Sequence, residues 1–154
     1  MSIEENKVII SRIWEDIFSE GKLELVNQFY DNSYVYHGPG KQELKGLEVL
    51  IQYKKLLRTF IPDAKFHLET VIAEGDKVAV HWSMTGTYAP TNIPLKQTGM
   101  IISRIVKGKC VEDWEVFDRL EMAEQGIRGW LQKKLLNSMI DKQKKAVPFL
   151  ALSS

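Results

Sequence analysis

The sequence has almost no cysteine: Cys110 is the single one among 154 residues. One cysteine cannot form an intrachain disulfide and cannot build a cysteine metal cluster. Cys110 lies between Lys109 and Val111, and no histidine stands beside it to activate the thiol. We therefore expect this thiol to pack in the core rather than to act as a nucleophile.

An excess of charge of one sign is also absent. The 21 Lys and Arg residues almost balance the 20 Asp and Glu residues, which leaves a net charge of +1. Proteins that bind nucleic acid or an anionic membrane surface usually carry a basic excess. We expect neither nucleic acid nor a membrane among the partners.

Long apolar runs and metal-ligand spacings are missing as well. No apolar stretch approaches the roughly 18 residues of a membrane-spanning helix, and the first residues lack the apolar core of a signal peptide. We expect a cytoplasmic protein. The three histidines, His37, His67 and His81, are too widely spaced for H-x-H or H-x-x-x-H ligation, so the sequence predicts no metal site.

The first half of the sequence is patterned as helices. Ser2 and Glu5 fit a capping box, an apolar face follows, and Gly21 provides the stop. A short second helix is expected over residues 22–30, a break over residues 31–33, and a third helix over residues 45–61, before Pro62. The Gly-Pro-Gly triplet at residues 38–40 indicates irregular backbone.

The second half alternates apolar and polar residues, as strands do. Four strands are predicted, in two hairpins, over residues 66–74, 78–88, 98–106 and 109–117. Helices followed by strands indicate an α+β fold, with the helices covering one face of a bent antiparallel sheet.

An amphipathic tail follows the strands. Its apolar residues recur at helical spacing over residues 126–145, at Ile127, Trp130, Leu131, Leu135 and Met139. We therefore divide the chain into a domain of residues 1–126 and a C-terminal helical extension of the same domain, residues 127–154. This helix either packs on the domain or clasps a second copy of the chain, and the pattern favours neither.

The last predicted strand carries acids on both of its faces. Trp114, Val116 and Asp118 share one parity, whereas Asp113, Glu115 and Phe117 share the other. One set must face the core of the domain, so at least one carboxylate is expected on an apolar side. The sequence does not decide which of Asp113, Glu115 and Asp118 that is.

Several motifs, taken together, resemble those of a known family. They are Trp14-Glu15, YVYHGP at residues 34–39, VIAEGDKVAVHW at 71–82, TGTY at 85–88 and KGKCVEDWEVFD at 107–118. In order and spacing they resemble the SnoaL-like polyketide cyclases, also called ester cyclases, whose fold is that of nuclear transport factor 2. The resemblance covers about residues 5–126 and leaves the tail outside.

The resemblance implies a cone-shaped apolar pocket between the helices and a strongly curved sheet. In the family the last strand presents an acid to this pocket, at the position matched by Asp118, and a histidine faces it at the position of His37. A carboxylate in apolar surroundings has a raised pKa and can move a proton next to a carbonyl group. The residues also allow another interpretation, in which Asp118 caps the next helix and His37 bonds loop backbone near Gly38.

Other residues are expected to bind substrate in the pocket. These are Trp14, Tyr34, Tyr53, Trp82, Met84, Met100, Arg104 and Trp114. Arg104 would stabilise an enolate oxygen, although a shift of one residue in the match would point it outward. Asp113 and Glu115 also depart from the residues that many relatives have at these two positions.

The resemblance implies a cofactor-independent enzyme that acts on a small apolar or carbonyl-containing ligand, by aldol-type cyclisation or isomerisation. Two alternatives stay open: a lyase or epoxide hydrolase, and a non-catalytic module that binds a small molecule or a protein. We further expect a homodimer, formed through the outer face of the sheet or through the helix of residues 127–139.

Overall fold

The structure is a computed structural model that describes residues 1–118, 120–121 and 124–125. The helices are α1 (Ile3–Arg12), continued by the π-helix η1 (Ile13–Ser19), then η2 (Leu23–Leu25), α2 (Val26–Phe29), η3 (Pro39–Lys41) and α3 (Leu47–Phe60). The strands are β1 (Tyr30–Gly38), β2 (Gln42–Lys45), β3 (Lys65–Glu74), β4 (Lys77–Tyr88), β5 (Ile93–Val106) and β6 (Lys109–Phe117).

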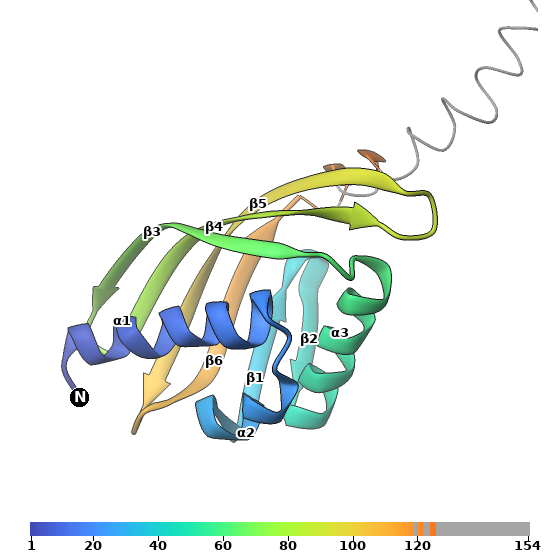
Figure 1. The fold of residues 1–154 in the computed structure, drawn as a ribbon. Helices are drawn as coiled ribbons and strands as arrows, with labels where there is room; N and C mark the ends of the chain where they lie inside the picture. The colour runs from blue at the N-terminus through green and yellow to red at the C-terminus, as the bar shows by residue number, and fades with distance from the viewer. Residues whose placement is uncertain (119, 122–123, 126–154) are drawn as a thin grey trace, which may run out of the picture.

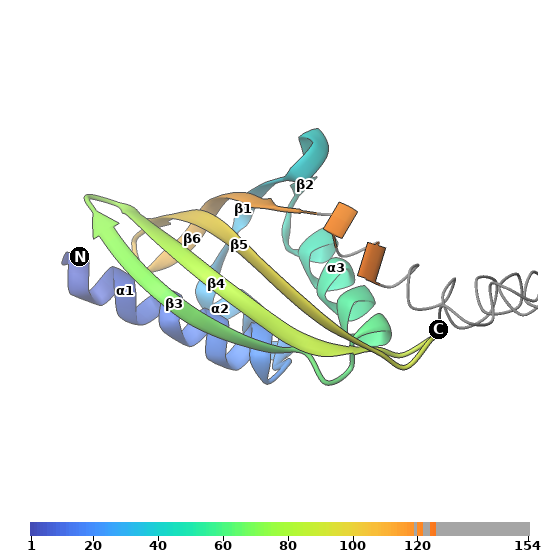
Figure 2. The ribbon, with the colours of Figure 1, turned by 90° about the horizontal axis from the view of Figure 1, so that it is seen from above.

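The six strands form one curved, unclosed sheet in the order β2-β1-β6-β5-β4-β3 (Figure 1). The helices cover its concave side. α1 and η1 lie across β3 and β4, and α3 packs beside β1 and β2 at the other end (Figure 2). The predicted α+β architecture, with N-terminal helices on a curved sheet, is confirmed.

The prediction of only four, wholly antiparallel strands is wrong. β1 and β2 were missed, and β1 runs parallel to β6. The expected break at residues 31–33 lies inside β1. There the Asp31 carboxylate accepts hydrogen bonds from the backbone N–H and the hydroxyl of Ser33, which forms a local turn. This local turn interrupts the pairing with β6 between Tyr30 and Val35 without ending the strand. Turn-forming residues therefore concealed a bulged strand.

The helical predictions hold with shifted limits. Ser2 caps α1 in a capping box with Glu5, as predicted, and Gly21 takes a positive φ of 72° after η1. The expected second helix is a 3₁₀ turn followed by four helical residues. The third begins at Leu47 because Lys45 pairs in β2. The proposed C-terminal helix lies outside the described residues.

Gly99, in the middle of the sheet, is a position where a larger residue would clash. Gly99 of β5 lies between Trp82 of β4 and Phe117 of β6, and the indole of Trp82 covers it. A Cβ added to Gly99 would lie 2.5 Å from Trp82 Cζ2. The glycine is therefore required by the close approach of the tryptophan ring.

The substitution Gly99→Ala is expected to lower the free energy of unfolding by about 2 kcal/mol, because Trp82 must move out of a packed interior. Urea denaturation measures this change. Met100→Ala is the matched control, since Met100 is the next residue and is exposed; it should change stability by less than about 0.5 kcal/mol. Equal effects of the two substitutions would contradict the packing of Trp82 on Gly99.

The outer, convex face of the sheet carries exposed apolar side chains. Met100 is 60% exposed and Trp114 is 37% exposed, and Ile102 and Val116 are exposed beside them. The expectation that Met100 and Trp114 face the interior is therefore wrong: both stand on the parity of β5 and β6 that points away from the helices. The homodimer through this face stays a prediction.

Candidate functional site

The two acids that face the interior of the sheet are Asp113 and Glu115 of β6. Asp113 is 2% exposed and Glu115 is 9% exposed, while Trp114 between them points outward. The acids therefore stand on the same side as the helices, where most neighbouring side chains are apolar. The strand places two carboxylates, two residues apart, on one buried face.

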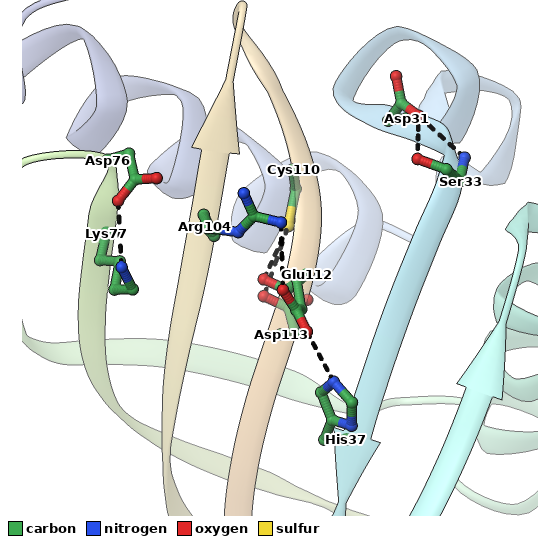
Figure 3. Close-up of polar contacts among 9 residues, drawn as sticks. All are labelled: Asp31, Ser33, His37, Asp76, Lys77, Arg104, Cys110, Glu112 and Asp113. Atoms are coloured by element: carbon green, nitrogen blue, oxygen red, sulfur yellow. Dashed lines mark hydrogen bonds and ion pairs between the residues drawn. The ribbon is translucent and has the colours of Figure 1, made fainter.

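The Asp113 carboxylate is fully hydrogen-bonded. The Tyr34 hydroxyl donates to its Oδ2 at 2.6 Å, and the Cys110 thiol donates to its Oδ1 at 3.4 Å (the latter drawn in Figure 3). The Ser103 side chain bonds it as well. Burial raises the pKa of Asp113, while these hydrogen bonds and the charge of Lys54 act in the opposite direction. With both oxygens occupied, Asp113 is suited to hold β1 and β5 against β6.

Glu115 has fewer partners. The Tyr36 hydroxyl donates to its Oε2 at 2.6 Å, and the Trp82 indole lies beside the carboxylate as a further, weaker side-chain partner. Burial raises the pKa of Glu115, and the positive charge of Lys54 and the Tyr36 hydrogen bond partly oppose that rise. Glu115 thus has fewer short hydrogen bonds than Asp113, and its proton affinity is increased.

Lys54 of α3 brings an amine to the same interior. It is 7% exposed, and its Nζ lies 3.2 Å from the centroid of the Phe18 ring. Burial lowers the pKa of Lys54 to about 8, although the charges of Glu115 and Asp113 oppose this change. Within the described part of the chain, Lys54 forms no salt bridge.

Two further polar atoms of the concave side lack partners. Trp82 Nε1 and Gln97 Oε1 are both buried and make no hydrogen bond with any residue that the structure describes. Trp82 is close enough to Glu115 to favour the ionised form of its carboxylate. Buried polar groups are nearly always satisfied in folded proteins, so groups of this kind indicate a place for water or a ligand.

Asp118, the predicted catalytic acid, lies elsewhere. It is exposed, and its Oδ1 accepts hydrogen bonds from the backbone N–H groups of Leu120 and Glu121 at 2.9 and 3.0 Å. This is the geometry of a helix cap, the alternative left open by the sequence. The inward acids are those of the opposite parity.

His37 and Arg104 meet on the outer face, not in the interior. Glu112 joins them: its Oε1 lies 2.9 Å from His37 Nε2, and its Oε2 accepts from Arg104 Nη2 at 3.2 Å (Figure 3). The His37 ring also stacks on Trp114 at a centroid distance of 5.6 Å. The expectation that His37, Arg104 and Trp114 face the pocket is therefore not met, because all three share the outward parity.

The other predicted pocket residues lie on the inner side. Trp14, Tyr34, Trp82 and Met84 are buried there, and Tyr53 is partly buried with its ring 6.1 Å from that of Tyr36. Separately, an open groove of 390 Å³ runs between η1 and β3, lined in part by the edge of Trp14. None of the groups described around Glu115 lines this groove, so the two features are distinct.

The roles of Tyr36 and Lys54 were not predicted from the sequence pattern. Tyr36 shares its parity with Tyr34, so a strand assignment for residues 30–38 would have pointed both hydroxyls inward. Lys54 follows Leu50 by four residues and so stands on the apolar face of the third helix. A lysine on such a face is the signal that could have identified it.

The described residues contain neither a membrane-spanning helix nor a metal-binding cluster. No helix among them is long and apolar enough to cross a membrane. No group of three or more His, Cys, Asp or Glu side chains in residues 1–118, 120–121 and 124–125 is arranged to hold a metal ion.

Comparisons with solved structures agree on the fold. A proposed polyketide cyclase from Acidithiobacillus ferrooxidans is 26% identical, with a TM-score of 0.69 over 81% of this chain and 96% of that one. Another from Bacillus cereus is also 26% identical, with a TM-score of 0.71 over 79% of each chain. A Catenulispora acidiphila protein of ketosteroid isomerase-like fold, in complex with trimethylamine, is 12% identical, with a TM-score of 0.69 over 76% of this chain and 90% of that one.

Comparisons of sequence identify the family. A search of the curated proteins finds no match. The profile of the SnoaL-like polyketide cyclases, however, matches residues 8–126, which is most of the chain and nearly all of its described part. The chain belongs to the SnoaL-like polyketide cyclase family.

Proposed function

We propose that this protein is a cofactor-independent enzyme that moves a proton at the carbon next to a substrate carbonyl group, with Glu115 as the general base. The observation that carries the proposal is the setting of Glu115: an inward carboxylate with a raised pKa, held by the Tyr36 hydroxyl and beside the Trp82 indole. A base of this kind must be ionised in part near neutral pH and must reach the substrate directly. Of the two acids, Glu115 has the fewer short hydrogen bonds and is therefore the better placed to reach a substrate.

The chemistry follows from the groups beside it. Glu115 Oε1 takes a proton from the α-carbon, and the electron pair of that C–H bond moves into the carbonyl group to form an enolate. In a cyclisation, the enolate carbon attacks a second carbonyl of the same molecule, whose oxygen then receives the proton from Glu115. In an isomerisation, the proton returns to a different carbon.

Neighbouring groups position the base and stabilise charge. The Tyr36 hydroxyl holds Oε2 and so fixes the position of the carboxylate on the inner face of β6. The Trp82 indole N–H lies beside Glu115 and makes no well-formed hydrogen bond among the described residues, so it is a donor for the developing enolate oxygen. Apolar side chains such as Met84 and Ile101 line the same face, which suits an apolar substrate.

Deuterium exchange tests this assignment against the one expected from the sequence. With a β-keto ester in deuterated water, the wild-type protein should accelerate exchange of the α-hydrogens, as followed by NMR. Glu115→Gln should slow the catalysed exchange about a hundredfold and leave ester affinity within a few fold. Asp118→Asn, the matched carboxyl-to-amide change at the surface, should leave the rate unchanged.

Two outcomes would contradict the proposal. Loss of exchange in Asp118→Asn, with Glu115→Gln active, would return the role of base to Asp118. Tight ester binding by the wild type without any acceleration of exchange would indicate a binding module of the same fold.

A further inference from the structure

Lys54 is a buried amine that has no role in the proton transfer proposed for Glu115. Its position on α3 points the amine between the Phe18 ring and the carboxylates of β6. The structure gives it no salt bridge within the described residues, so Glu115 and Asp113 influence it through space without direct contact. A lysine kept only to neutralise a buried acid would be expected in an ion pair with it.

We propose that Lys54 is a nucleophilic amine that forms an imine with the carbonyl group of a small ketone or aldehyde. Three geometric observations support this assignment: the amine is largely buried, it lies against an aromatic ring, and it shares the concave side with the buried carboxylate of Glu115. Desolvation in apolar surroundings is one of the ways in which proteins activate lysine for this reaction.

The ionisation of Lys54 supports the same assignment. Burial, together with the like charge of Arg58, lowers the pKa of Lys54 to about 8 against the opposing carboxylates. Roughly a tenth of the amine is then neutral at pH 7, against well under a thousandth for an ordinary lysine. The contact with Phe18 favours the ammonium form, but the ring does not replace the lost hydration.

The reaction balances without any oxidant or reductant. The Nζ lone pair attacks the carbonyl carbon, a C–N bond forms, and the carbonyl oxygen takes up a proton as the nitrogen loses one. The resulting hydroxyl group is protonated by the carboxylic acid form of Glu115 and leaves as water when the C=N bond forms. The products are a protonated imine on Lys54 and one molecule of water.

The inference deepens the proposed function and rests on it only in requiring that carbonyl compounds reach this interior. A protonated imine withdraws electrons from the adjacent carbon more strongly than a ketone does. The Glu115 carboxylate left by the dehydration step is then placed to remove the α-proton and give an enamine. An enamine of this kind can attack a second carbonyl group, as an aldol-type cyclisation requires.

Trapping with a defined probe tests the inference. The full-length protein is incubated at pH 7 with 2,4-pentanedione, with and without sodium cyanoborohydride, and the modified lysines are located by peptide mass spectrometry. Lys54 should be labelled at least about tenfold faster than Lys55, its exposed neighbour on the same helix. A near-ultraviolet absorption band of the conjugated enaminone should accompany the reaction.

Two substitutions test whether labelling requires the primary amine of Lys54 or only a positive charge at this position. Lys54→Arg keeps a cation but cannot form an imine, so specific labelling and the absorption band should be lost while the protein stays folded by circular dichroism. Lys55→Met should change neither. Labelling of Lys54 no faster than that of Lys55 would overturn the inference, as would an unchanged absorption band in Lys54→Arg.

The β-keto ester exchange assay distinguishes this inference from the proposed function. If exchange depends on Glu115 but Lys54 is not labelled, the inference on Lys54 fails and the general base stands. If Lys54 is labelled but Glu115→Gln exchanges at the wild-type rate, the amine is confirmed and the role of Glu115 is wrong.

Discussion

Replacing Asp113 by alanine is expected to lower the free energy of unfolding by about 4 kcal/mol. The substitution removes the acceptor of the Tyr34 hydroxyl, the Cys110 thiol and the Ser103 side chain, all in the buried interior. Each unsatisfied buried donor costs about 1 to 3 kcal/mol, the weak thiol least. The carboxylate's own desolvation, which raises the pKa of Asp113, is relieved by the substitution and offsets part of this loss.

Urea denaturation at pH 7 measures the effect. Glu112→Ala is the matched control, because Glu112 precedes Asp113 on β6 and makes its hydrogen bonds to His37 and Arg104 on the outer face. Exposed pairs of this kind contribute about 1 kcal/mol or less. An Asp113→Ala variant as stable as Glu112→Ala would contradict the structural role of Asp113.

A double-mutant cycle shows how much of the lost stability comes from the hydrogen bond between Tyr34 and Asp113. Tyr34→Phe alone leaves Asp113 without its shortest hydrogen bond, and combining it with Asp113→Ala removes both partners. The double variant should be less destabilised than the sum of the single ones, with a coupling energy of about 1 to 3 kcal/mol. Simple additivity would show that the pair is not coupled.

The inward acids also explain how far the sequence could predict this structure. The alternation of β3 to β6 predicted the strands and their turns, because residues of one parity must share a face. It did not predict which face is the inner one. Apolar residues such as Met100, Trp114 and Val116 stand outside, whereas the polar residues Asp113 and Glu115 stand inside. A rule that places apolar residues in the core therefore misassigned Met100 and Trp114.

The candidate site could not be predicted from the sequence for a related reason. Tyr34 with Asp113 and Tyr36 with Glu115 each join residues 79 positions apart, and they meet only because β1 lies beside β6 in parallel. That pairing depends on a strand which the turn-forming residues 31–33 concealed. The resemblance to the family identified the fold correctly, but the position it matched, Asp118, is a helix cap at the surface.

Replacing Lys54 by methionine should remove about 3 kcal/mol of the rise in the free energy of unfolding that the wild type shows between pH 7 and pH 10.5. The pKa of Lys54 is lowered in the folded protein from 10.5 to about 8, so the unfolded chain binds more protons between these two values. Stability contributed by such a group rises with pH through this window. Below pH 8 the folded protein bears the full penalty of a buried ammonium, and above pH 10.5 it bears none.

Lys54→Met removes this group from both states. Relative to the wild type, the variant should therefore be more stable at pH 7 by an amount that shrinks by about 3 kcal/mol as the pH rises to 10.5. Both proteins contain the buried tyrosines, whose pKa values burial raises, so their titration cancels. Loss of the Lys54 charge lets the pKa values of Asp113 and Glu115 rise further, which lowers the stability of the variant as the pH rises and so acts in the same direction. Packing differences between lysine and methionine cancel as well, since they do not vary with pH.

Urea denaturation at intervals from pH 6 to pH 10.5 measures the difference, with Lys55→Met as the exposed control on α3. The Lys55→Met curve should run parallel to the wild type, since the side chain of Lys55 is exposed in the folded state. If stability against pH for Lys54→Met also runs parallel to that of the wild type, Lys54 titrates as a solvated amine. The reactive amine proposed for this position would then lose its physical basis, because a lysine with an ordinary pKa is almost wholly protonated at neutral pH.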